Sequence, residues 1–131
     1  MATAKRKPKK QAGKSKGQQK ELVEMALAFP GATEHFPWGE RVVKVGGKVF
    51  VFLGRDDEDD GVGFAVKLPE SAPAALALPF CEPTGYGLGK SGWVNVTFKG
   101  KKAPMDLMRQ WMTESYRAVA PKKFLELFDA R

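Results

Sequence analysis

Cysteine and histidine are almost absent from this 131-residue sequence, which contains one of each, Cys81 and His35. A lone cysteine excludes an internal disulfide and is typical of a reducing compartment. The chain also lacks the run of about 18 apolar residues that a membrane-spanning helix needs. Its first residues lack the apolar segment of a secretory signal. We therefore expect a cytoplasmic protein with no membrane partner.

The scarcity of these side chains also limits chemistry. His35 has Glu34 beside it, but no second histidine or nearby cysteine completes a metal site. Cys81 has no evident catalytic histidine or asparagine constellation around it. We expect a structural or surface histidine, a small buried or edge thiol, no catalytic residues, no metal and no cofactor.

Two ligand-binding templates are only partly matched. Asp56, Glu58, Asp60 and Gly61 fit positions 1, 3, 5 and 6 of a calcium loop, but position 12 is Lys67 instead of the required glutamate. We interpret this segment as a solvated acidic turn.

The second template is glycine-rich. Residues 87–92 (Gly-Leu-Gly-Lys-Ser-Gly) satisfy the pattern G-x-G-x-x-G, yet the alternating strand pattern 93–98 follows them. Phosphate binding by such a loop needs a helix N-terminus after it. We therefore expect a flexible connection over 80–92 and no nucleotide site.

Acidic residues are missing from the first 20 positions, which carry eight Lys or Arg residues, so that a net charge of +7 for the chain leaves −1 for residues 21–131. Residues 1–17 also contain no large apolar side chain after Met1. Such a segment cannot bury enough surface to order itself, so we expect a disordered lysine-rich arm over 1–17. Either it neutralises phosphates or it serves only as a solubilising tail.

The rest of the chain, residues 18–131, has a hydrophobic pattern sufficient for one domain. Trp38–Leu53 reads as two strands joined by a Gly46-Gly47 turn, because glycine adopts positive φ without steric cost. The simplest register pairs Val45 with Lys48, Val43 with Phe50 and Arg41 with Phe52. Further strands are expected at 63–68 and 93–98.

Helical periodicity predicts helices over 18–29, 70–78 and 104–119, with a further helical turn or two over 122–128. Residues 32–37 read as a loop. In strand 93–98, Val94, Val96 and Phe98 would face the core. Trp93 would then lie exposed among Lys44, Lys67 and other polar residues on the opposite face, where aromatic and cationic side chains together can hold nucleic acid. Cover by a loop or a partner subunit is the alternative for Trp93.

Three segments together resemble the MmcQ/YjbR family of small bacterial proteins. They are Phe36–Gly39 running into Val45–Phe50, Tyr86–Val94, and Glu114–Arg117 through Val119–Lys123. The resemblance covers residues 20–129. It implies an α-β(3)-α-β(2)-α domain of the α+β class, an antiparallel sheet with helices on one face, similar to secretion chaperones and frataxin-like sandwiches. The family is commonly labelled DNA-binding, through a proposed double-wing arrangement. Many members carry Gly-Arg-His-Gly-Trp where this chain has Gly89-Lys90-Ser91-Gly92-Trp93, so recognition through that arginine or histidine is not expected here.

Three functions remain open at this point. We expect most strongly a non-enzymatic domain that binds DNA or another nucleic acid. The alternatives are a protein-interaction or chaperone-like module and, less favoured, a small-molecule binder. The oligomeric state is left open. The candidate nucleic-acid contacts are the basic residues of the arm and the fold together with one aromatic residue: Lys5, Arg6, Lys7, Lys9, Lys10, Arg41, Lys44, Lys67, Lys90, Trp93, Arg117, Lys122 and Lys123.

Overall fold

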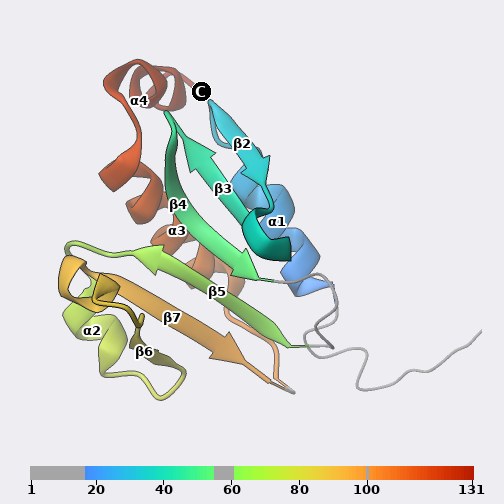
Figure 1. The fold of residues 1–131 in the computed structure, drawn as a ribbon, viewed down its shortest axis with the longest axis vertical. Helices are drawn as coiled ribbons and strands as arrows, with labels where there is room; N and C mark the ends of the chain where they lie inside the picture. Colours follow the sequence, from blue (N-terminus) through green and yellow to red (C-terminus); the bar gives the residue numbers. More distant parts are fainter. Residues whose placement is uncertain (1–16, 55–60, 100) are drawn as a thin grey trace, which may run out of the picture.

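A single antiparallel sheet with helices packed on it organises the chain (Figure 1), as a computed structural model shows. The model describes residues 17–54, 61–99 and 101–131. The six strands lie in the order β2-β3-β4-β5-β7-β6. The expected α+β class is therefore confirmed. All of the predicted arm except Gly17, and most of the predicted acidic turn, lie outside the described residues.

The elements follow one another in a simple order. They are α1 (Gln18–Leu27), β2 (Ala32–His35), the 3-10 turn η2 (Pro37–Gly39), β3 (Arg41–Val45), β4 (Lys48–Gly54), β5 (Val62–Lys67), α2 (Ala72–Leu76), β6 (Cys81–Pro83), the 3-10 turn η3 (Leu88–Ser91), β7 (Trp93–Phe98), α3 (Met105–Val119) and α4 (Lys122–Asp129).

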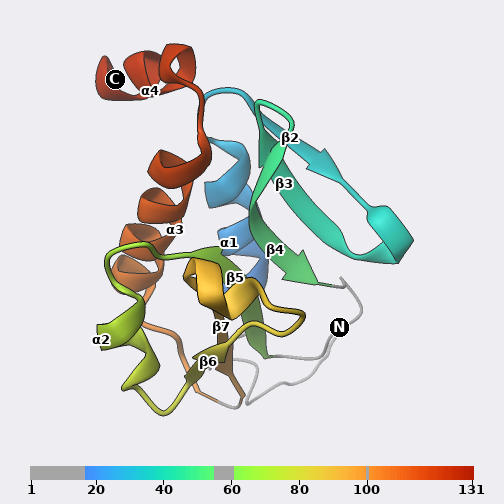
Figure 2. The ribbon, with the colours of Figure 1, turned by 60° about the vertical axis from the view of Figure 1, so that its left-hand side comes forward.

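The core lies between the sheet and the helices α1 and α3, which cover the same face (Figures 1 and 2). Phe29 stacks on Tyr116 with a centroid distance of 4.6 Å. Phe50 meets Phe29 and Tyr116 edge-on at 5.6 and 5.3 Å. These rings join α3 and the end of α1 to the centre of the sheet, so one apolar layer stabilises the whole domain.

Two strands occupy segments where the sequence predicts irregular structure. Ala32–His35 is strand β2 instead of a loop, and its four residues pair with Val45 to Val42 of β3. Cys81–Pro83 is the short strand β6 beside β7. Neither segment has a β-rich composition; each is held by the backbone of a neighbouring strand, which local patterns do not encode.

The predicted hairpin is correct at its turn and wrong beyond it. Gly46 and Gly47 both have positive φ, 60° and 83°, and Val45 pairs with Lys48 as expected. Two register shifts then pair Val43 with Val51 and Val42 with Phe52. Such bulges place two successive residues against one partner. As a result Phe50 and Val51 both belong to the core, and Phe52 turns to the opposite face.

Three consecutive residues of α3 connect it to different parts of the fold. The Glu114 carboxylate accepts hydrogen bonds from the backbone N–H of Glu70 and Ser71 at 2.9 and 3.0 Å, and from the Ser71 hydroxyl. It thereby holds the turn that precedes α2; this helix begins only at Ala72 and is shorter than the predicted helix over 70–78.

The other two residues of this segment hold the sheet and the α1–β2 connection. The buried Ser115 hydroxyl donates to the carbonyl of Phe50 and accepts from the N–H of Lys67, which joins β4 to β5. The Tyr116 hydroxyl donates to the carbonyl of Pro30 at 2.7 Å. These contacts give the segment a structural role.

Candidate functional site

The face of the sheet opposite α1 and α3, here called the outer face, carries the candidate site. Side chains alternate along β5: Phe64 and Val66 belong to the core cluster, whereas Ala65 and Lys67 point the other way. Val42, Ala65 and Trp93 are buried although none of them belongs to that core cluster. The outer face therefore has a small apolar layer of its own.

Trp93 belongs to this layer, and the expectation of an exposed indole is wrong. Its side chain is 8% exposed, and its ring meets Phe52 at 5.2 Å with an interplanar angle of 66°. The cause is the bulged register of β4, which turns Phe52 to the outer face. Trp93 is thus a packing residue covered by a neighbour of the same sheet.

Three of the predicted lysines lie at one end of the outer face. Lys67 pairs with Trp93, and Lys44 pairs with Val49 near the hairpin turn. Val51 of β4 pairs with Val66 of β5. On this side of that pair lie both Val49 and Lys67, so Lys44 and Lys67 are at the same end of the strands. Lys90 is exposed in η3, which leads directly into β7. We call Lys44, Lys67 and Lys90 the lysine row.

These lysines have no acidic partner within residues 17–54, 61–99 and 101–131. Two acidic residues lie on or near this face: Glu82 on β6, opposite Asn95 and two positions along β7 from Trp93, and Glu40, before β3. Among the described residues, lysines therefore outnumber acidic residues at this end of the face.

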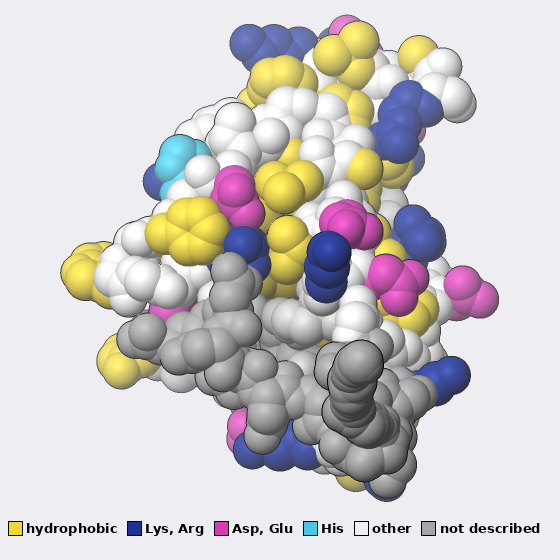
Figure 3. All heavy atoms as spheres, turned by 90° about the vertical axis from the view of Figure 1, so that its right-hand side faces the viewer, with side chains coloured by type: hydrophobic (Ala, Val, Ile, Leu, Met, Phe, Trp, Pro, Cys, Tyr) yellow, Lys and Arg dark blue, Asp and Glu magenta, His cyan; other side chains and the backbone are white. Residues whose placement is uncertain are grey.

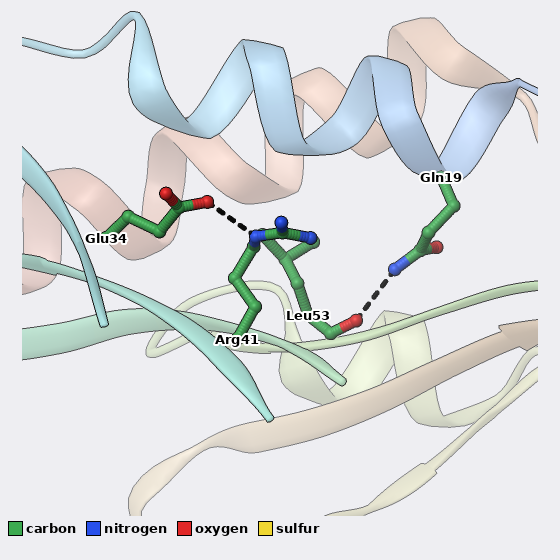
Figure 4. Close-up of polar contacts among 4 residues, drawn as sticks. All are labelled: Gln19, Glu34, Arg41 and Leu53. Atoms are coloured by element: carbon green, nitrogen blue, oxygen red, sulfur yellow. Dashed lines mark hydrogen bonds and ion pairs between the residues drawn. The ribbon is translucent and has the colours of Figure 1, made fainter. Parts of the chain in front are cut away.

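Two predicted arginines are already engaged. The Nε of Arg41 donates to Oε2 of Glu34 at 2.6 Å, and both side chains lie on the α1 side of the sheet (Figure 4). The Arg41 side chain is 14% exposed, and its guanidinium also lies 4.9 Å from the centroid of the Phe36 ring. Arg41 is therefore separated from the lysine row by the sheet.

Arg117 is likewise paired, with 2.6 Å between its Nη2 and Oδ1 of Asp129. It lies on α3, away from the outer face. Lys122 and Lys123 begin α4, next to the β3–β4 turn (Figure 1), because Gly46 of that turn packs against Pro121. These two lysines therefore lie near the end of the sheet that carries Lys44, but on a helix that is not part of the outer face. The predicted arm contacts, Lys5, Arg6, Lys7, Lys9 and Lys10, lie outside the described residues.

Figure 3 shows the side of the molecule that carries the free edge of β2. On this side the described Lys and Arg side chains are interspersed with Asp and Glu, and hydrophobic side chains protrude among them. The described surface in this view therefore has no continuous positive band.

Two exposed aromatic residues were missed by the sequence analysis. Tyr86 is fully exposed, and Trp38 is 92% exposed. Both have left-handed backbone conformations, with φ of 59° and 55°, respectively. That region is unfavourable for side chains larger than glycine and often marks functional loops. The available signal was their sequence context, because Tyr86 lies between two glycines and Trp38 between a proline and a glycine.

Tyr86 and Trp38 lie in different loops with different charged neighbours. Tyr86 lies in the loop between β6 and η3, four residues from Lys90, and Trp38 lies in η2 beside Glu40. Figure 2 shows both connections on the side of the sheet away from α3. Tyr86 is therefore the exposed ring at the lysine end of the outer face.

A cavity of about 380 Å³ opens at the other end of the outer face, where β4 and β5 separate. The Gln19 side-chain amide bridges these strands, donating to the carbonyls of Leu53 (Figure 4) and Gly63 and accepting from the N–H of Gly63. Phe52 and Asn95 also line the cavity. The size is within the range of small-ligand sites, so the small-molecule alternative stays open.

The two scarce reactive residues have ordinary structural surroundings. The His35 ring and the Thr33 hydroxyl are 3.0 Å apart on the exposed strand β2. Burial raises the pKa of the Cys81 thiol to about 11, so the thiol is protonated at neutral pH and a poor nucleophile. Among the described residues, no cluster of three or more His, Cys, Asp or Glu side chains has a metal-binding arrangement. In the same part of the chain, no helix combines the length and apolarity needed to cross a bilayer.

Comparison with known protein families shows which family the chain matches. The family model described as YjbR matches residues 27–118, which include the sheet, Trp38, Tyr86, the lysine row and most of α3. No curated protein matches the chain in sequence.

Proposed function

The chain belongs to the YjbR family, and from the geometry of its outer face we propose that it is a non-enzymatic protein that binds nucleic acid. The observation that carries this proposal is the lysine row, which has no acidic partner in the part of the chain that the structure describes, beside the exposed ring of Tyr86. Ammonium groups bind phosphates, and an exposed ring can stack on a base. The single free cysteine fits a cytoplasmic location.

Two sets of cations would contribute in different ways. Lys5, Arg6, Lys7, Lys9 and Lys10 supply sequence-independent phosphate contacts through counterion release. Lys44, Lys67 and Lys90 hold the ligand at the outer face. Arg41 and Arg117 are left out of the proposed interface because each already has a carboxylate partner at 2.6 Å.

The test is the salt dependence of binding of the full chain to a fluorescent oligonucleotide. We expect the logarithm of the association constant to fall linearly with the logarithm of salt concentration. Replacing the five arm residues with glutamine should make that slope shallower. Absence of binding at about 50 mM salt would overturn the proposal, and an unchanged slope would remove the arm from it.

A second candidate function, protein interaction, is favoured by the η2 corner. Trp38 is 92% exposed and Phe36 49% exposed. They follow β2, which forms an edge of the sheet and has backbone groups open to a further strand. Exposed aromatic residues beside an open edge are typical of protein interfaces. The partner proposed here is a second copy of the chain, joined through β2.

Sedimentation velocity over a range of protein concentrations tests this second candidate. A dimer that Trp38→Ala disrupts and Leu127→Ala leaves intact would support it, since Leu127 is also exposed but lies on α4. A monomer at all concentrations would contradict it.

A further inference from the structure

Tyr86 projects into solvent from a loop whose backbone is tied to the sheet. Its fully exposed side chain lies in a short loop whose backbone is tied on both sides. The N–H of Thr84 donates to the carbonyl of Trp93 at 3.1 Å, and the N–H of Gly89 donates to the carbonyl of Thr84 at 3.0 Å. The loop is thus attached to the start of β7, so the backbone that carries Tyr86 lies at the end of the sheet where Lys67 pairs with Trp93.

The glycines around Tyr86 are needed for this geometry. A Cβ on Gly92, with φ of 89°, would lie 3.2 Å from the carbonyl oxygen of Leu68, and one on Gly89 would lie 3.0 Å from the Pro83 side chain. These close approaches pack η3 against the end of β5 and against β6. The strained φ of Tyr86 therefore belongs to a tightly built loop, which favours a role for the ring in binding.

The charges beside this ring distinguish it from Trp38. Tyr86 and Lys90 share one loop, and Lys67 lies on the strand paired with β7. Glu40 lies two residues after Trp38, and the nearby Arg41 is bound to Glu34. Charge complementarity therefore places a polyanion at the Tyr86 end.

We propose that this end of the outer face binds single-stranded DNA in preference to duplex, with one unpaired base stacked on Tyr86 and adjacent phosphates held by Lys67 and Lys90. The inference rests on the proposed function and names its ligand. A duplex hides the faces of its bases, whereas a single strand offers them to an exposed ring. The hydroxyl of Tyr86 is not required for stacking.

The experiment measures binding of a labelled 12-nucleotide single strand and of the corresponding duplex to the full chain at one salt concentration. Tyr86→Ala should weaken single-strand binding by roughly 5- to 100-fold, and Tyr86→Phe should retain it. Binding to the duplex should change much less. Trp38→Ala is the matched control, because it removes an equally exposed ring from the other end of the face.

Each outcome has a distinct meaning. Single-strand affinity that is unaffected by Tyr86→Ala, or lost equally in Tyr86→Phe, would overturn the stacking inference while nucleic-acid binding remains. An equal loss in Trp38→Ala would also overturn the assignment to Tyr86. Absence of binding to both oligonucleotides would overturn the proposed function itself.

Discussion

The rings of Phe52 and Trp93 meet edge-on at 5.2 Å on the face of the sheet that the helices leave uncovered. Phe52 comes from β4 and Trp93 from β7, with β5 between them. The contact therefore spans three strands. Trp93, which the sequence analysis took as an exposed nucleic-acid contact, instead packs within the sheet, and Tyr86 is the exposed ring at this end of it.

Replacement of Trp93 and replacement of Tyr86 should have different effects on stability. Trp93→Ala should lower the free energy of unfolding by about 3 kcal/mol, because it removes a buried ring and leaves a cavity. Tyr86→Ala should change it by less than about 0.5 kcal/mol, because the side chain is fully exposed. Urea unfolding followed by circular dichroism measures both values. Similar losses for the two variants would contradict the assignment.

The two glycines of the β3–β4 turn provide a matched pair. A Cβ on Gly46 would lie 2.4 Å from Cγ of Pro121, whereas one on Gly47 would have no atom within 4 Å. Both residues have positive φ, so each substitution carries backbone strain. We expect Gly47→Ala to cost about 1 kcal/mol and Gly46→Ala about 2–4 kcal/mol.

The additional cost of Gly46→Ala should come from Pro121. Pro121→Ala in the Gly46→Ala background should therefore recover part of the lost stability, as a double-mutant cycle would measure. Equal costs at Gly46 and Gly47 would contradict the packing of the turn against the α3–α4 connection.

Ser115 offers a test of the junction between α3 and the sheet. Its hydroxyl serves the carbonyl of Phe50 and the N–H of Lys67, and the side chain is fully buried. Ser115→Ala leaves both backbone groups without this partner, so we expect a loss of about 1–3 kcal/mol in chemical denaturation. Thr113→Ala on the same helix removes an exposed hydroxyl and is the control. A loss at Ser115 no larger than at Thr113 would count against this bridge.

The single cysteine gives a direct pH prediction. Burial raises the pKa of Cys81 from 9.0 to about 11. The folded protein then keeps a proton that the unfolded chain loses, so this thiol's contribution to stability is complete below pH 9 and disappears as the pH rises toward about 11.

Alkylation by iodoacetamide measures the same shift, because the thiolate is the reacting form. The folded protein should show a midpoint near pH 11 and the urea-unfolded chain one near pH 9. A midpoint near 9 for the folded protein would contradict the burial of Cys81.

Part of the fold could be predicted from local patterns, and the remainder depended on contacts between distant segments. The 3.6-residue periodicity identified α1 and α3, and Gly46-Gly47 marked the hairpin turn because glycine accepts the positive φ that the turn requires. Strand β2 was missed because its pairing with β3 defines it, and that pairing is not encoded in the residue pattern of β2 itself. The bulges in β4 were missed because no residue type in Phe50–Leu53 signals them.

The candidate site was predictable to a similar extent. The placement of Lys44 and Lys67 on the outer face was predicted correctly, because side chains alternate along strands; a role for these lysines in binding stays a prediction. Trp93 was misjudged because its cover, Phe52, reaches the outer face only through the bulged register. Trp38 and Tyr86 were overlooked because exposure in a glycine-flanked turn depends on how the loop folds back on the sheet.

The most direct test compares two sets of charge-neutralised full chains in binding to the same single-stranded oligonucleotide. One carries Lys44→Gln, Lys67→Gln and Lys90→Gln on the outer face. The other carries Lys101→Gln and Lys102→Gln, two exposed lysines that follow the opposite end of β7. Loss of three phosphate contacts should reduce the magnitude of the salt slope by about 2, and the Lys101/Lys102 variant should match the unmodified protein. An unchanged slope in the outer-face variant, or an equal reduction in both, would contradict the assignment of nucleic-acid binding to this face.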